Sequence, residues 1–158
     1  MQKLIQKLNF ELIHYGSNSF EKDWFASIRN INFLNKPEGG LWASPVNSKY
    51  GWIDWCKREN FELQRLKESF KFNCNGSFIV INKPEDLKEL PLCFRECSIE
   101  RKKLRPYFDF EKMAKEVDGV YLTEAGEYKT RLSFPLNFYG WDCESVLIFN
   151  FNVIKYGD

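Results

Sequence analysis

The feature that most limits the fold is the irregular order of short predicted strands and helices, which turn-forming residues separate. Runs of alternating or β-branched apolar residues predict strands at residues 10–15, 41–44, 77–82, 118–122 and 144–155. Apolar periodicity and capping residues predict helices at residues 20–30, 50–59, 84–90 and 109–117. Residues 61–72 have mixed periodicity and receive no assignment. Because no strand–helix–strand rhythm runs through this order, we predict an α+β fold.

The length of 158 residues predicts a single domain, residues 1–158, whose core needs no disulfide or structural metal. The 23 Lys and Arg residues nearly balance the 22 Asp and Glu residues, so the overall charge does not indicate nucleic-acid binding. Unbroken aliphatic–aromatic runs, such as residues 146–149, are far shorter than the roughly 20 residues that span a bilayer. Polar residues interrupt the first eight positions. We therefore expect a soluble cytoplasmic domain with no signal peptide, membrane anchor or membrane partner.

The five cysteines are odd in number and scattered, which is typical of reduced thiols. Cys93 and Cys97 would share one helical face, but a closed zinc site needs two further ligands at a recognisable spacing, so we predict no metal site. Cys143 lies between two acids, which raise the pKa of a thiol and make it a poor nucleophile. No Gly-x-Ser-x-Gly, Walker A or Gly-x-Gly-x-x-Gly motif occurs, which leaves serine-hydrolase, mononucleotide and Rossmann functions without support.

Three short segments combine residues that can build a ligand site in a chain that is 17% aromatic. The first is a strand that ends in the single histidine, His14, and in Gly16, whose backbone can approach a ligand closely. The second turns at two glycines and then presents the flat ring of Trp42. The third opens an apolar strand with Glu144, an acid that needs solvent or a partner in a cleft. Each segment also has a structural explanation: a hydrogen-bonded histidine, a hairpin with a core tryptophan, or an acid at a solvated strand end.

Taken in order, these segments resemble the motifs of the histidine–tyrosine–glutamate class of ADP-ribosyltransferases, the group of diphtheria toxin and the poly(ADP-ribose) polymerases. The family pattern is a strand ending in His-Gly-Thr or His-Gly-Ser, then a Gly-Ile-Tyr-Phe-Ala-like segment, then a glutamate opening one of the last strands. The matching segments are His14-Tyr15-Gly16-Ser17, Gly40-Leu41-Trp42-Ala43-Ser44 and Asp142-Cys143-Glu144-Ser145-Val146-Leu147-Ile148-Phe149. The chain departs from the pattern twice, because Tyr15 follows the histidine directly and Trp42 replaces the tyrosine.

The resemblance implies two small, mostly antiparallel sheets with short helices around an NAD-binding cleft. It implies mono-ADP-ribosyl transfer from NAD, the substrate, to a protein or nucleic-acid acceptor, with release of nicotinamide, as in a phage-encoded or toxin-like enzyme. Glu144 would contact the 2′-hydroxyl of the nicotinamide ribose, where a carboxylate stabilises the oxocarbenium-like cation that forms as the glycosidic bond breaks. The implied NAD-binding residues are His14, Gly16, Ser17, Trp42, Ser44, Tyr50 and Trp52.

Within that implied site, His14 would bind the adenine-side ribose and Gly16 the nicotinamide amide. Trp42, together with Tyr50 or Trp52, would sandwich the nicotinamide ring. Ser44 would support the glutamate or the amide.

Other functions stay open. An RNA 2′-phosphotransferase or an NAD glycohydrolase would share this general fold and pocket, although one histidine and seven arginines suit a phosphotransferase poorly. A non-catalytic phage or bacterial binding or inhibitor protein could use the many aromatic residues as a contact surface. A protein of this fold that has lost its NAD chemistry would explain the two departures. The basic run at residues 101–105 is interpreted as a solvated face, because acids surround it.

Overall fold

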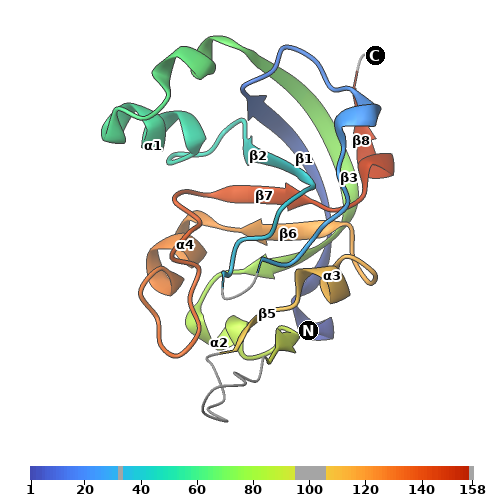
Figure 1. The fold of residues 1–158 in the computed structure, drawn as a ribbon, viewed down its shortest axis with the longest axis vertical. Coiled ribbons are helices and arrows are strands. Elements are labelled where there is room, and N and C mark those ends of the chain that lie inside the picture. Colours follow the sequence, from blue (N-terminus) through green and yellow to red (C-terminus); the bar gives the residue numbers. More distant parts are fainter. Residues whose placement is uncertain (32–33, 95–105, 157–158) are drawn as a thin grey trace, which may run out of the picture.

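The computed structural model describes residues 1–31, 34–94 and 106–156. Five strands of this part close into a barrel in which β2 and β3 flank β1, and β7 and β6 complete the circle (Figure 1). The barrel strands are β1 (Ile5–Tyr15), β2 (Leu41–Pro45), β3 (Ser69–Ile81), β6 (Gly119–Leu122) and β7 (Ser145–Ile148). Neighbouring strands are antiparallel except β3 and β6, which are parallel.

Alternation along the strands separates two apolar clusters, because successive side chains point to opposite faces of a sheet. One cluster lies on the inward face and contains Leu12, Ala43, Phe72, Cys74, Phe78, Val146 and Ile148. The other lies on the outward face beneath the short helices and contains Ile79, Ile81, Val120, Leu122, Leu147, Phe110 and Phe138. The pattern along β3 follows this division: its first half alternates buried and exposed residues, whereas its last four residues are buried on both faces.

Short helices cover the barrel and one small ribbon pairs beside it (Figure 1). The helices are α1 (Trp52–Glu59), α2 (Pro84–Leu87), α3 (Phe110–Met113) and α4 (Glu124–Thr130). The 3-10 turns are η1 (Gln2–Leu4), η2 (Lys22–Trp24), η3 (Leu63–Lys67) and η4 (Phe151–Val153). The remaining strands are β4 (Leu92–Cys93) and β5 (Tyr107–Phe108), which form the ribbon, and β8 (Ile154–Lys155), which pairs with β3.

The α+β class is confirmed, but the expected pair of small, mostly antiparallel sheets is wrong. The eleven residues of β1 pair with β3 along their whole length, from Ile5 opposite Ile79 to Tyr15 opposite Ser69. The other edge of β1 meets β2, so the sheet returns on itself and closes. Closure removes exposed edges, which is why a barrel replaces two open sheets.

Three predicted elements also differ from the structure. The segment predicted as a helix at residues 20–30 forms only η2, because Phe20 packs against the inner cluster whereas Ile28 packs against the outer one. The strand predicted at residues 144–155 ends at Ile148, since the Asn150 side chain accepts a hydrogen bond from the backbone of Asn152 and begins η4. The unassigned residues 61–72 contain η3 and the start of β3.

Two absences concern the described part of the chain. None of its helices is long and apolar enough to cross a membrane. Its His, Cys, Asp and Glu side chains form no group of three or more that is placed to hold a metal ion. Cys93 lies on β4 rather than on a helix. Cys97 and the basic run at residues 101–105 lie outside the described residues.

Candidate functional site

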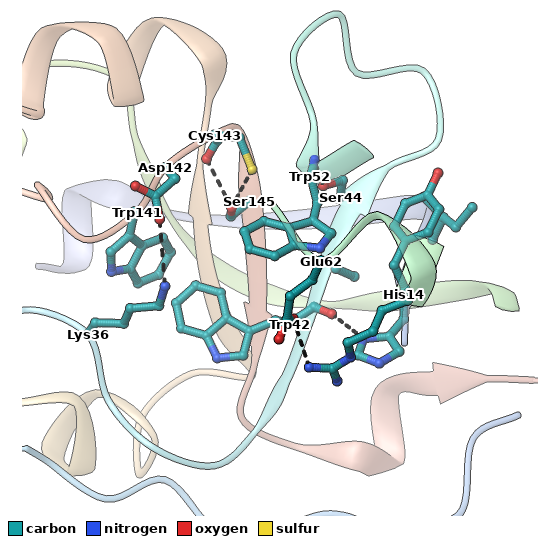
Figure 2. A pocket seen from close by; sticks show the side chains of 14 residues that line it. His14, Lys36, Trp42, Ser44, Trp52, Glu62, Trp141, Asp142, Cys143 and Ser145 are labelled. Carbon is teal, nitrogen blue, oxygen red and sulfur yellow. Dashed lines mark hydrogen bonds and ion pairs between the residues drawn. The ribbon is translucent and has the colours of Figure 1, made fainter. Parts of the chain in front are cut away.

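A cavity of about 220 Å³ lies between the barrel and the segment that carries α1 and η3 (Figure 2). Its barrel wall comes from the end of β1, the outer face of β2 and the residues where β7 begins. Its other wall comes from α1 and η3. Four of the residues expected at an NAD site line this cavity: His14, Trp42, Ser44 and Trp52.

Strand order explains why distant segments meet at this cavity. β2 lies between β1 and β7, with Ile13 opposite Ser44 on one edge and Ala43 opposite Val146 on the other. One wall of the barrel therefore brings together the segment around His14, the segment around Trp42 and the start of β7. The spacing of these segments along the sequence does not predict that they are neighbours.

His14 is held by a backbone group of the neighbouring strand. Its Nδ1 lies 2.7 Å from the carbonyl oxygen of Trp42. Burial and, to a smaller extent, the nearby charge of Arg65 lower the pKa of His14 below its ordinary 6.5, although the hydrogen bond opposes this shift. The imidazole is therefore neutral at pH 7. Because a carbonyl can only accept, Nδ1 carries the proton and Nε2 is left as a hydrogen-bond acceptor.

Three tryptophans give the cavity flat apolar walls. Trp42 packs edge-on against Trp141, with ring centroids 4.6 Å apart. Trp52 stacks on Trp55 of the same helix at 5.0 Å, and the pair meets Phe61 edge-on. Figure 2 shows the Trp42 and Trp52 rings approaching the same space from the barrel and from α1. Aromatic packing of this kind holds each ring in one orientation, which suits a planar ligand.

Ser44 connects the two walls. Its hydroxyl accepts a hydrogen bond from the backbone of Trp52 at 2.9 Å and donates one to the carbonyl of Glu144 at 3.3 Å. A Cβ at Gly51 would lie 3.1 Å from the Ser44 hydroxyl, a tight contact that glycine avoids. Ser44 thus joins the start of α1 to the start of β7 and contacts the backbone of Glu144, not its carboxylate.

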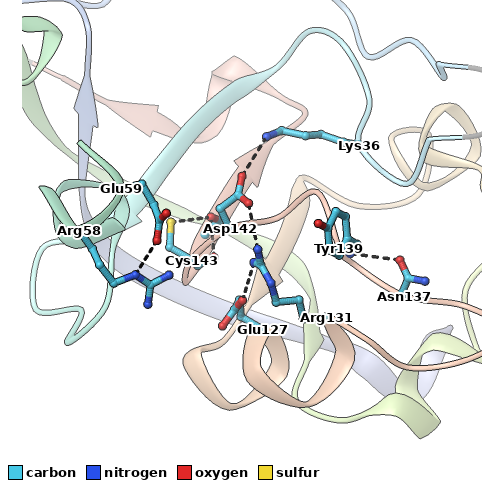
Figure 3. A network of polar contacts seen from close by, with 10 residues as sticks. Lys36, Arg58, Glu59, Glu127, Arg131, Asn137, Tyr139, Asp142 and Cys143 are labelled. Atoms are coloured by element: carbon cyan, nitrogen blue, oxygen red, sulfur yellow. Dashed lines mark hydrogen bonds and ion pairs between the residues drawn. The ribbon is translucent and has the colours of Figure 1, made fainter. Parts of the chain in front are cut away.

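Charged side chains lie at the ends of the cavity. At the His14 end, Arg65 pairs with Glu62 at 3.0 Å. At the other end, Asp142 pairs with Lys36 at 3.9 Å and, outside the cavity lining, with Arg131 at 3.5 Å (Figure 3). The exposed Arg65 pair contributes little stability, because water screens it. Each end therefore combines a cation with a carboxylate.

Glu144 is placed differently from the expectation. The residues before and after it, Cys143 and Ser145, line the cavity, but Glu144 is not among the described residues that do so. Its buried carboxylate accepts hydrogen bonds from Ser48 Oγ and from Tyr121 Oη, both at 2.5 Å. Burial and the carboxylate raise the pKa of Tyr121 well above its ordinary value. Alternation at the start of β7 thus directs this acid away from the tryptophans.

Three further expected residues do not line the cavity within the described chain. Gly16 adopts φ +104°, donates its backbone N–H to Glu68 and lies beneath the Arg65 guanidinium. Ser17 donates its hydroxyl to the carbonyl of Ser19. Tyr50 packs beneath Arg58, and its buried hydroxyl has no hydrogen-bond partner among the described residues.

The structure adds lining residues that were not among the expected site residues: Lys36, Glu62, Arg65, Trp141 and Asp142. Arg65 and Glu62 come from the segment with mixed periodicity, so their position depends on how η3 folds over β1. Lys36 lies shortly before the double-glycine turn, and Asp142 is the first residue of the segment matched to the third motif.

The cysteine nearest the cavity is unsuited to nucleophilic chemistry. Burial, with the nearby acids Asp142 and Glu127, raises the pKa of Cys143 to about 12, although a hydrogen bond with Ser145 opposes this shift. A thiol with this pKa is almost entirely protonated at neutral pH.

Taken together, the residues that line the cavity offer a neutral imidazole, indole faces, two cations and two carboxylates. No family model matches the chain, and no curated protein or solved structure is significantly similar to it.

Proposed function

We propose that this chain is an NAD-dependent mono-ADP-ribosyltransferase whose cavity binds the nicotinamide end of NAD. The observation that carries the proposal is the convergence of His14, Trp42 and Trp52 on one cavity. These residues come from segments that the sequence separates and that adjacent barrel strands and α1 bring together.

The size and chemistry of the cavity suit part of a dinucleotide. Ligand pockets commonly measure about 300–1,000 Å³. The volume of about 220 Å³ is below this range, so the cavity would hold only the nicotinamide end, while the diphosphate and adenosine would lie along the rim. The indole faces of Trp42 and Trp52 suit a planar ring. His14 Nε2 can accept a hydrogen bond from a ribose hydroxyl, and the guanidinium of Arg65 can bind phosphate oxygens.

The reaction requires a carboxylate near the ribose. Breaking the bond between nicotinamide and ribose leaves an oxocarbenium-like cation, which a nearby negative charge stabilises. In the proposal this is Glu144, whose backbone lies at the cavity edge between two lining residues. Its carboxylate must leave Ser48 and Tyr121 and turn toward the cavity when NAD binds.

A second candidate is a protein that binds a nucleotide without cleaving it. The position of Glu144 favours this alternative, because two hydroxyl donors and burial hold the carboxylate outside the cavity. In that case the acid stabilises the end of the barrel, and the tryptophans and His14 form a binding site alone.

Two measurements separate the candidates. When NAD is titrated into the protein, the tryptophan fluorescence should be quenched to saturation, and Trp42→Leu should remove this quenching. The matched control is Trp24→Leu, since Trp24 is 73% exposed and is not a lining residue. Incubation with labelled NAD and a cell lysate should release nicotinamide and label an acceptor, and Glu144→Gln should abolish both. Quenching without nicotinamide release selects the binding protein, and no quenching at all contradicts both candidates.

A further inference from the structure

The Asp142 end of the cavity already holds a positive charge against an aromatic face. Lys36 Nζ lies 5.3 Å from the centroid of the Trp42 ring and 3.9 Å from Asp142 Oδ2. All three side chains line the cavity, and Figure 2 shows the ammonium reaching from the rim toward the carboxylate. An indole face and a carboxylate that converge on one point together attract a cation.

We propose that Trp42 and Asp142 form a cation subsite, which the chain's own Lys36 fills in this structure and which a cationic aromatic ring of the ligand takes in its place. The subsite extends the proposed function, on which the identity of that ring rests: in oxidised NAD the nicotinamide is a pyridinium cation. The neutral ring of reduced NAD and free nicotinamide would lack this attraction.

Lys36 can leave the subsite at little cost. Its side chain is 44% exposed, and an ammonium on a flexible stem is readily solvated. Its ion pair with Asp142 is long and partly exposed, so it contributes little free energy. Asp142 keeps a second cation, Arg131, at 3.5 Å when the lysine moves away.

The two groups that form the subsite are, in contrast, held in place. The Trp42 ring is fixed by its edge-on contact with Trp141. The carboxylate of Asp142 is only 21% exposed and is anchored by Arg131, which in turn pairs with Glu127 at 3.1 Å (Figure 3). A preorganised site of this kind loses little conformational freedom when the ligand exchanges for the lysine.

A planar cation should compete well with an ammonium for this position. Its charge is delocalised and weakly hydrated, and its ring stacks on the indole as well as being attracted to it. The attraction also distinguishes substrate from product in the proposed reaction, because cleavage converts the pyridinium into neutral nicotinamide. The product would then leave more readily than the substrate.

The test uses two small probes of nearly the same shape, 1-methylnicotinamide, which is a cation, and nicotinamide, which is neutral. Binding to the full chain is followed by tryptophan fluorescence or by NMR shifts of the indole N–H groups. The cation should bind at least about fivefold more tightly than the neutral probe. Lys36→Met should raise the affinity for the cation a further few-fold, because it empties the subsite and leaves its carboxylate, with little effect on nicotinamide.

The matched control is Lys22→Met. Lys22 Nζ lies 5.8 Å from the ring of Phe151, so this variant removes the same kind of contact, and neither residue lines the cavity. It should leave both affinities unchanged. Equal affinities for the two probes, or weaker binding of the cation by Lys36→Met, would overturn the subsite.

The outcome is separable from that of the proposed function. Preference for 1-methylnicotinamide without binding of NAD would support the subsite and contradict NAD as the ligand. Binding of NAD without any preference between the two probes would overturn the subsite and leave the proposed function intact.

Discussion

Replacing Tyr121 by phenylalanine tests whether the Glu144 carboxylate is held at the end of the barrel. The Tyr121 hydroxyl donates to Glu144 Oε1 at 2.5 Å, and the carboxylate is buried. The variant removes this donor but keeps the ring, which packs edge-on against Phe10 at 5.0 Å. A hydrogen bond to a charged group contributes about 1.5–3 kcal/mol to stability. We expect the free energy of unfolding to fall by this amount, since Ser48 remains as one donor.

For a chain of this length, about 1 kcal/mol shifts the melting temperature by about 2–4 °C. The expected decrease is therefore about 3–12 °C, measured by circular dichroism and confirmed by urea denaturation. Tyr128→Phe is the matched control, because the Tyr128 side chain is 84% exposed and its hydroxyl faces water. This control should match the original chain.

Ser48→Ala adds a second measurement on the same carboxylate. Each single variant leaves Glu144 one donor, whereas the double variant leaves it none, so the double loss should exceed the sum of the single losses. A Tyr121→Phe variant within about 0.5 kcal/mol of the original chain would refute the reasoning, because it would mean that the carboxylate does not depend on this donor. In that case Glu144 would be free to face the cavity without ligand.

Three further predictions concern His14, two buried cysteines and Gly40. Because burial holds the pKa of His14 below 6.5, the unfolded chain binds a proton that the folded chain does not, so stability should fall as the pH drops below about 6.5. His14→Gln should flatten this dependence of stability on pH, measured by urea titrations from about pH 5 to 8. Burial raises the pKa of Cys74 and Cys143 to about 12, so iodoacetamide at pH 8 should modify these two thiols only after unfolding. Peptide mapping by mass spectrometry checks this, and alkylation of either thiol in the native state would contradict it. Gly40 has φ +68°, and a side chain there would meet the carbonyl of Ile148 at 2.5 Å, so Gly40→Ala should cost more than about 1 kcal/mol in urea denaturation, whereas Gly140→Ala, with 3.6 Å of space, should be nearly neutral.

Local patterns predicted the elements whose residues keep one periodicity, which is the helical period in α1 and the two-residue alternation between the two apolar clusters in β6. The helix at α1 and the strand at β6 appear close to the expected positions. The prediction at residues 20–30 failed because its apolar residues serve two clusters on opposite faces of the barrel, which a single periodicity cannot distinguish from one helical face.

The candidate site shows the same division. The family resemblance named His14, Trp42, Ser44 and Trp52 among its NAD-binding residues, and all four line the cavity. Arg65 and Lys36 were missed, since an isolated basic residue is most often solvated and nothing nearby in the sequence marks it as a ligand group.

The sequence by itself indicated the α+β class and four of the residues that line the cavity, because local patterns and short motifs depend on near neighbours. The closed barrel, the position of β2 between β1 and β7, and the direction of the Glu144 side chain depend on which strands pair and in which register. A shift of one position in register turns every side chain of a strand to its other face. Whether an acid at the start of β7 meets a ligand or two hydroxyl groups is therefore set by long-range pairing, which no local pattern contains.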